Sequence, residues 1–223
     1  MTSTITWDQP LIAVDVIPYT LDPITRKLGV VVSKRKHAPN TGDFALPGVL
    51  LLANERAHVA AERAIKTKIN EDINITFIRD IGVADNPDRD IRGPSLSVLF
   101  LAVVENVVET DDVKVVPIED TAAYAFPFDH NNLIARATKV INSYVLADKE
   151  ATKALVGENF RTTDMFTVLD SLHKVTGDGL APDPSNLSRR LKGTEWVSKV
   201  DQTEALALTS SSKGRPSTYW SFD

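Results

Sequence analysis

The period at which apolar residues recur changes along the chain, and this change limits the folds that the sequence can adopt. Apolar residues alternate or run together in segments 11–20, 28–34, 73–83 and 96–104. Such segments predict β-strands. Residues 55–69 instead repeat with helical spacing. A region of strands with one helix in its middle predicts an α+β fold.

Shorter segments complete this first region. Residues 44–48 (FALPG) predict a short strand that enters a turn. Residues 113–118 predict an edge strand or a connection, because Pro117 cannot donate a hydrogen bond within a central ladder. One face of the predicted helix is expected to be buried, and it carries Val59, Ala60, Arg63, Ala64 and Ile65.

The second half of the chain has a helical pattern. Asp129 is placed to cap one helix, a second helix fits residues 163–175 with Gly177 at its end, and a short helix begins at Pro184. Helix, helix and short helix are followed by segments with strand character, which is the order of a winged helix-turn-helix.

Two of these later segments, 196–200 and 205–209, are predicted to pair as strands, and 217–222 is predicted to form a last strand. The change from strands to helices predicts two domains. We place them at residues 1–147 and 148–223, with the boundary between 147 and 157.

Composition narrows the possible functions. The chain has no cysteine, which excludes disulfides, a thiol nucleophile and a zinc site with cysteine ligands. It has no apolar run of about 18 residues and no signal-peptide pattern at its start, so we expect a cytoplasmic protein without a membrane partner. Its net charge of -5 means that any contact with DNA must come from a local cluster of basic residues.

One such cluster lies on the short helix that begins at Pro184. Leu187 and Leu191 are four residues apart and can anchor the helix, which leaves the polar and basic residues facing outward. Arginine can contact guanine edges, and lysine, serine and asparagine suit phosphates or bases. The candidate DNA-binding residues, including two at the expected wing tip, are Asn186, Ser188, Arg189, Arg190, Lys192, Lys213 and Arg215. The alternative is a solvated helix face and an ordinary hairpin.

The first region contains a degenerate motif. Leu46-Pro47-Gly48, Glu55 and Arg63 resemble the Nudix box, in which carboxylates one helical turn apart gather divalent cations against a diphosphate. Here the distance from Gly48 to Glu55 is one residue too long. The positions of the other box glutamates are Ala64, Thr67 and Lys68. We therefore predict no catalytic residue and no metal site, with Glu55 either capping the helix or paired with Arg63.

The two halves together resemble the Nudix-related transcriptional regulators, the NrtR group. The resemblance rests on FPFDHNNLIARA at residues 126–137, NLSRRL at 186–191 and GRPSTY at 214–219. It implies a mixed-sheet Nudix-like domain that senses a metabolite, followed by a winged helix-turn-helix, in a homodimeric repressor that binds a palindromic operator in double-stranded DNA. The implied effector is ADP-ribose or another nucleotide of NAD metabolism, with no cofactor. The candidate ligand-binding residues are Arg35, Lys36, Glu55, Arg63 and Arg92.

Three alternatives remain open at this point. Other branches of the group sense sugars or sugar phosphates. A divergent Nudix hydrolase would turn over a nucleoside diphosphate derivative with a divalent cation. A protein-interaction module would use the second domain for docking, and would lack the salt-dependent affinity that DNA binding requires.

Overall fold

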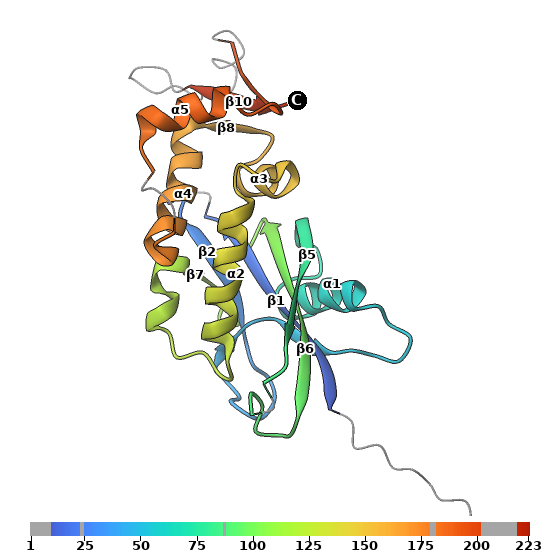
Figure 1. The fold of residues 1–223 in the computed structure, drawn as a ribbon. Helices are drawn as coiled ribbons and strands as arrows, with labels where there is room; N and C mark the ends of the chain where they lie inside the picture. The colour runs from blue at the N-terminus through green and yellow to red at the C-terminus, as the bar shows by residue number, and fades with distance from the viewer. Residues whose placement is uncertain (1–9, 23–24, 87, 179–181, 202–217) are drawn as a thin grey trace, which may run out of the picture.

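The structure is a computed structural model that describes residues 10–22, 25–86, 88–178, 182–201 and 218–223. Figure 1 shows a long sheet flanked by helices, with a smaller group of helices and strands beyond one end of helix α2 (His130–Tyr144). No helix in these ranges is both long and apolar enough to cross a membrane.

The larger sheet is mixed, as the α+β prediction implies. Its strands are β1 (Leu11–Leu21), β2 (Leu28–Lys34), β3 (Phe44–Ala45), β4 (Gly48–Leu50), β5 (Asn74–Ala84), β6 (Ser95–Glu105) and β7 (Val113–Pro117). The main path runs β3-β2-β1-β6-β5. β1 is parallel to β6 and antiparallel to β2 and β4. Among the described strands β7 pairs with β2 alone, which confirms the edge position expected from Pro117.

Helices cover both faces of this sheet (Figure 1). Side chains of β1 alternate between the two faces: Val16 packs in the apolar cluster under α1 (Ala57–Lys68), and Ile17 packs in the cluster under α2. This alternation follows from the period of two in a strand. Because both faces are covered, β1 and β6 are apolar along most of their length.

Helix α1 is rotated relative to the predicted face. Ala60, Ala64 and Ile65 are buried as expected, but Val59 is 46% exposed, so its prediction was wrong. Ala61 is buried instead. Alanines at three contact positions let the helix backbone approach the sheet closely, which favours an alanine-rich face over one that contains the larger Val59.

Helix α2 belongs to both parts of the chain. Its face of Leu133, Ile134, Ala137 and Ile141 is buried against the sheet. The Tyr19 hydroxyl on β1 and the Thr138 hydroxyl on α2 lie 2.9 Å apart in this interface. Helix α4 (Thr162–Thr176) packs along α2 as well. One continuous apolar cluster therefore runs from the large sheet into the C-terminal part.

The segment in which we place the domain boundary contains a helix, α3 (Lys149–Val156). The Asp148 carboxylate caps this helix by accepting a hydrogen bond of 3.0 Å from the Ala151 backbone N–H. Ala151 and Leu155 are buried in the common apolar cluster. The helix has only eight residues, too few for a clear sequence period, and its apolar contacts hold it in place.

The remaining elements form the smaller part of the molecule. They are the 3-10 helix η1 (Ile118–Ala123), β8 (Asn159–Arg161), α5 (Pro184–Lys192), β9 (Val197–Lys199) and β10 (Tyr219–Phe222). β8, β10 and β9 form a three-stranded sheet with β10 in the middle. The helix predicted over 163–175, its end at Gly177, the helix at Pro184 and the last strand are confirmed. Segment 205–209, the predicted partner of β9, lies outside the described residues; β9 pairs with β10.

Candidate functional site

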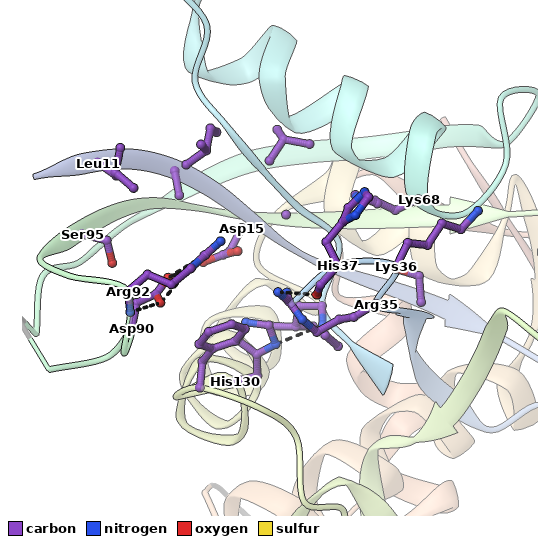
Figure 2. Close-up of a pocket in the computed structure, with 18 of the residues that line it drawn as sticks. Leu11, Asp15, Arg35, Lys36, His37, Lys68, Asp90, Arg92, Ser95 and His130 are labelled. Carbon is purple, nitrogen blue, oxygen red and sulfur yellow. Dashed lines mark hydrogen bonds and ion pairs between the residues drawn. The ribbon is translucent and has the colours of Figure 1, made fainter. Parts of the chain in front are cut away.

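A pocket of about 430 Å³ opens beside β1, β4 and the N-terminal end of α2 (Figure 2). Its lining is strongly basic in a protein whose net charge is -5. The basic residues are Lys34, Arg35, Lys36, Arg63, Lys68, Arg89 and Arg92. The carboxylates among the described lining residues are those of Asp15 and Asp90. Such a lining favours an anionic ligand.

Arg89 connects the pocket to helix α2. Its Nη2 donates to Asp15 on β1 at 2.9 Å and to Asp129, just before α2, also at 2.9 Å. The Arg89 side chain is only 6% exposed. Burial alone would lower the pKa of Arg89, but its bonds to Asp129 and Asp15 outweigh burial and raise it. Asp129 was predicted to cap α2, yet its side chain makes no capping bond and binds Arg89 instead.

Gly48 gives Asp15 the space that this arrangement needs. β4 pairs with β1 so that Gly48 lies opposite Asp15. A Cβ atom on residue 48 would lie 2.3 Å from Asp15 Oδ1, closer than real Cβ contacts. Any side chain at position 48 would therefore displace the Asp15 carboxylate.

A second group of residues lines the pocket at the junction that precedes α2. Phe128 has a left-handed backbone (φ 61°), a conformation that costs a non-glycine residue about 1–3 kcal/mol. Its ring centroid lies 4.7 Å from Arg35 Cζ and 6.0 Å from Arg92 Cζ. The strained junction thus holds an aromatic ring beside two guanidinium groups in the pocket wall.

His130, the first residue of α2, is nearly fully buried and also lines the pocket. Its Nδ1 accepts a hydrogen bond of 3.1 Å from the Leu46 backbone N–H. Burial lowers the pKa of His130, so the ring is neutral at pH 7 and carries its proton on Nε2. Within the described part of the chain no group pairs with Nε2, which leaves this N–H as a donor for a ligand.

The structure brings together four of the five predicted ligand residues. Arg35, Lys36, Arg63 and Arg92 line the pocket. Glu55 does not; its carboxylate accepts two hydrogen bonds from Arg63, at 2.7 and 2.8 Å, which is the pairing expected as the alternative to a ligand role. The bond from Arg63 lowers the pKa of Glu55 to about 2. Arg92 pairs with Asp90, which fixes its guanidinium at the pocket rim.

Sequence reasoning missed several pocket residues, namely Asp15, Lys34, Arg89, Asp90, Phe128 and His130. One signal was present for Asp15, a single charge inside an apolar strand. The FDH sequence at 128–130 was noticed as a junction motif, without a role in the pocket. Within the described residues there is no group of three or more His, Cys, Asp or Glu side chains that could hold a metal ion.

The second candidate surface is the outer face of α5. Leu187 and Leu191 are buried, as predicted, while Arg189 and Arg190 are exposed. Arg189 Nη2 donates to Asn186 Oδ1 at 2.8 Å, and Arg190 has no side-chain partner among the described residues. Asp183 caps the helix by accepting from the Ser185 N–H. The predicted wing residues Lys213 and Arg215 lie outside the described residues.

The fold and the basic pocket define a class of protein: a Nudix-type domain continued by a C-terminal part with its own helices and small sheet. No protein-family model matches the chain. An ADP-ribose pyrophosphatase of Methanocaldococcus jannaschii is 32% identical over 140 residues, which are 61% of this chain and 73% of that protein. The chain therefore belongs to the Nudix family.

Solved structures extend the likeness to the whole chain. NrtR of Shewanella oneidensis has a TM-score of 0.72 at 21% identity and covers 96% of this chain and 94% of its own. The same protein in complex with a 27mer DNA has a TM-score of 0.71 at 22% identity and covers 95% of this chain and 93% of its own. The predicted resemblance to the Nudix-related regulators is confirmed in the fold. An ADPR-responsive transcriptional repressor, NtrR of Acinetobacter baylyi, is 24% identical over 145 residues, 61% of this chain and 56% of that protein.

Proposed function

We propose that this protein is a DNA-binding transcriptional repressor whose pocket senses ADP-ribose or another NAD-related nucleotide. The observation that carries the proposal is helix α5, which buries two leucines and turns Arg189 and Arg190 outward in a protein of net charge -5. A helix with this arrangement suits the major groove of DNA. Support comes from the whole-chain likeness to NrtR, which has been solved with DNA.

The ligand class follows from the basic pocket. A diphosphate carries charges that arginine binds in a forked geometry, and four arginines, Arg35, Arg63, Arg89 and Arg92, line the pocket. The Nudix domain of S. oneidensis NrtR has been solved with ADP-ribose; it has a TM-score of 0.53 at 24% identity and covers 60% of this chain and 90% of its own. The proposed DNA contacts are Asn186, Ser188, Arg189, Arg190 and Lys192 of α5, together with Lys213 and Arg215.

Helix α2 is the proposed link between pocket and DNA. It begins at the Arg89–Asp129 pair and spans about 22 Å, at 1.5 Å per residue for its 15 residues. It packs on α4, which packs on α5. A ligand that draws Arg89 or Arg35 toward its phosphates moves the start of α2 and, through α4, the DNA-binding helix. Such a ligand acts as a switch only if it binds one arrangement better than the other.

We further propose that the protein acts as a homodimer on a palindromic operator. Two copies of α5 related by a two-fold axis would then enter successive major grooves, about one helical turn apart. We place the division between the two domains at residue 147, in the connection between α2 and α3.

Pulldown of sheared genomic DNA by the purified full chain tests the proposal. We expect enrichment of a palindromic site, and loss of that enrichment when ADP-ribose is added. Binding should weaken as salt rises, because contacts with phosphates release counterions. Enrichment that persists with ADP-ribose, but is lost with a sugar phosphate, would reassign the ligand. The absence of any enriched site at low salt would overturn the DNA-binding role.

The second candidate function is hydrolysis of ADP-ribose, which the name of the M. jannaschii relative favours. Against it stand Ala64, Thr67 and Lys68 at the glutamate positions of the box, and Glu55 bound by Arg63. We expect no release of AMP from ADP-ribose with Mg²⁺, Mn²⁺ or Zn²⁺, measured by chromatography of the nucleotides. Turnover that is lost in Glu55→Gln would instead identify an enzyme.

A further inference from the structure

Three lysines, Lys34, Lys36 and Lys68, belong to the lining of two cavities at once. They line the ligand pocket, and they also line a neighbouring cavity of about 270 Å³ together with Thr67, Ile69, Thr110, Asp112 and Val113. Lys34 comes from the end of β2, Lys36 from the loop after it, and Lys68 from the last residue of α1. Figure 2 shows Lys36 and Lys68 extending on the same side of the pocket. We refer to these three residues as the lysine cluster.

The charges of the lysine cluster are largely uncompensated. Lys34 Nζ donates to the backbone carbonyl of Asp111 at 3.4 Å, and not to a carboxylate. Lys36 Nζ is 3.9 Å from Asp112 Oδ2, at the limit of an ion pair, and 72% of its side chain is exposed. Lys68 has no carboxylate partner within the described residues. Gathering three ammonium groups costs electrostatic energy, which a bound anion offsets.

Hydroxyl groups complete the cavity wall. Thr110 Oγ1 accepts hydrogen bonds from the backbone N–H groups of Asp112 and Val113, at 3.2 and 3.1 Å. Its own O–H therefore remains as a donor. Thr67 Oγ1 donates back to the Arg63 carbonyl at 2.6 Å, which fixes the last turn of α1 next to Lys68.

We infer that the lysine cluster is a subsite for a phosphoryl group of the ligand, and that it binds this group without a divalent cation. The inference rests on the proposed ligand-sensing role of the same pocket and adds how the phosphate is held. The three ammonium groups and the Thr110 hydroxyl match phosphate oxygens as donors, whereas ammonium groups repel a divalent cation and offer it no lone pair. The charge that a metal ion would supply to a diphosphate is supplied here by the chain itself.

Calorimetry with inorganic pyrophosphate as the probe tests the inference in the full-length protein. With EDTA present, wild-type protein should bind pyrophosphate, and Lys68→Ala should weaken binding about tenfold, as expected for loss of one charge-assisted hydrogen bond. Lys66→Ala is the matched control: Lys66 lies on the same helix and is exposed, but it is absent from both cavity linings. Its affinity should stay within about twofold of wild type.

A reversal experiment separates metal-free binding from metal-dependent binding. Thr67→Glu combined with Lys68→Glu replaces a hydroxyl and an ammonium group with carboxylates, and it should abolish pyrophosphate binding in EDTA and make it depend on Mg²⁺. Wild-type binding that requires Mg²⁺, or equal losses in Lys68→Ala and Lys66→Ala, would overturn the inference. These outcomes are distinct from failure of the proposed function. If ADP-ribose releases the protein from DNA only with Mg²⁺, the proposed repressor function stands and the metal-free subsite is excluded. If pyrophosphate binds without a metal ion but the protein binds no DNA, the repressor function is excluded and the subsite stands.

Discussion

Replacing Arg190 with alanine should weaken operator binding by about 30-fold or more while leaving the fold intact. A bidentate contact between arginine and a base contributes about 1–3 kcal/mol, and a two-fold symmetric dimer loses it at both half-sites. Arg190 is exposed on α5 and its side chain has no partner among the described residues, so removal of the side chain costs little stability. Titration of labelled operator in a mobility-shift assay measures the loss, and the thermal midpoint checks the fold.

Arg56→Ala is the control for this substitution. Arg56 is also an exposed arginine without a described ion pair, but it precedes α1 in the other part of the molecule. It should keep wild-type affinity, apart from the small effect of one unit of charge. Equal affinities for Arg190→Ala and Arg56→Ala would remove α5 from the DNA interface.

Replacing Arg89 with methionine should lower the free energy of unfolding by about 3–5 kcal/mol, the usual cost of breaking a buried ion pair. The substitution keeps most of the side-chain volume but leaves the carboxylates of Asp15 and Asp129 without their shared cation. Asp15 is only 7% exposed, so water cannot compensate for the loss. Urea denaturation followed by circular dichroism gives the change in midpoint.

Arg92→Met provides the comparison, because the Arg92 side chain is 47% exposed and pairs with the adjacent Asp90. Its effect should stay below about 1 kcal/mol. Adding Asp15→Asn and Asp129→Asn to Arg89→Met should recover part of the lost stability, because no buried charge then remains unpaired. If Arg89→Met and Arg92→Met unfold at the same urea concentration, the ion pairs of Arg89 with Asp15 and Asp129 do not stabilise the fold.

Long elements could be predicted from the sequence because their patterns repeat often enough to be read. β1, β2, β6 and α4 fall within one or two residues of their predicted bounds, and α2 begins directly after Asp129. α3 could not be predicted, since its eight residues depend on contacts with the sheet and with α4 more than on local propensity. The exposure of Val59 could not be predicted from the sequence either, because the way in which α1 packs on the sheet decides which of its residues face inward.

The residues of the candidate site were harder to predict from the sequence than the long helices and strands. Arg63 was found because it belongs to the degenerate Nudix box, and Arg35, Lys36 and Arg92 were named together with the family resemblance. Arg89 has no such signal: its role depends on Asp15, 74 residues away, and Asp129, 40 residues away. Asp129 shows how a distant partner can outweigh a local one. Its position before α2 is that of a capping residue, but in the fold its carboxylate binds the buried Arg89.

β10 is the middle strand of the small sheet and lies at the end of the described chain. The two parts of the molecule are therefore completed at different times during translation. The last residue that lines the ligand pocket is His130, and β10 is made about 90 residues later. At about 5–20 residues per second, that delay is roughly 5–20 seconds. β8 and β9 have no common neighbour in their sheet until β10 emerges. The lining of the proposed sensing pocket can thus be synthesised before the sheet beside the proposed DNA-binding helix α5 is complete.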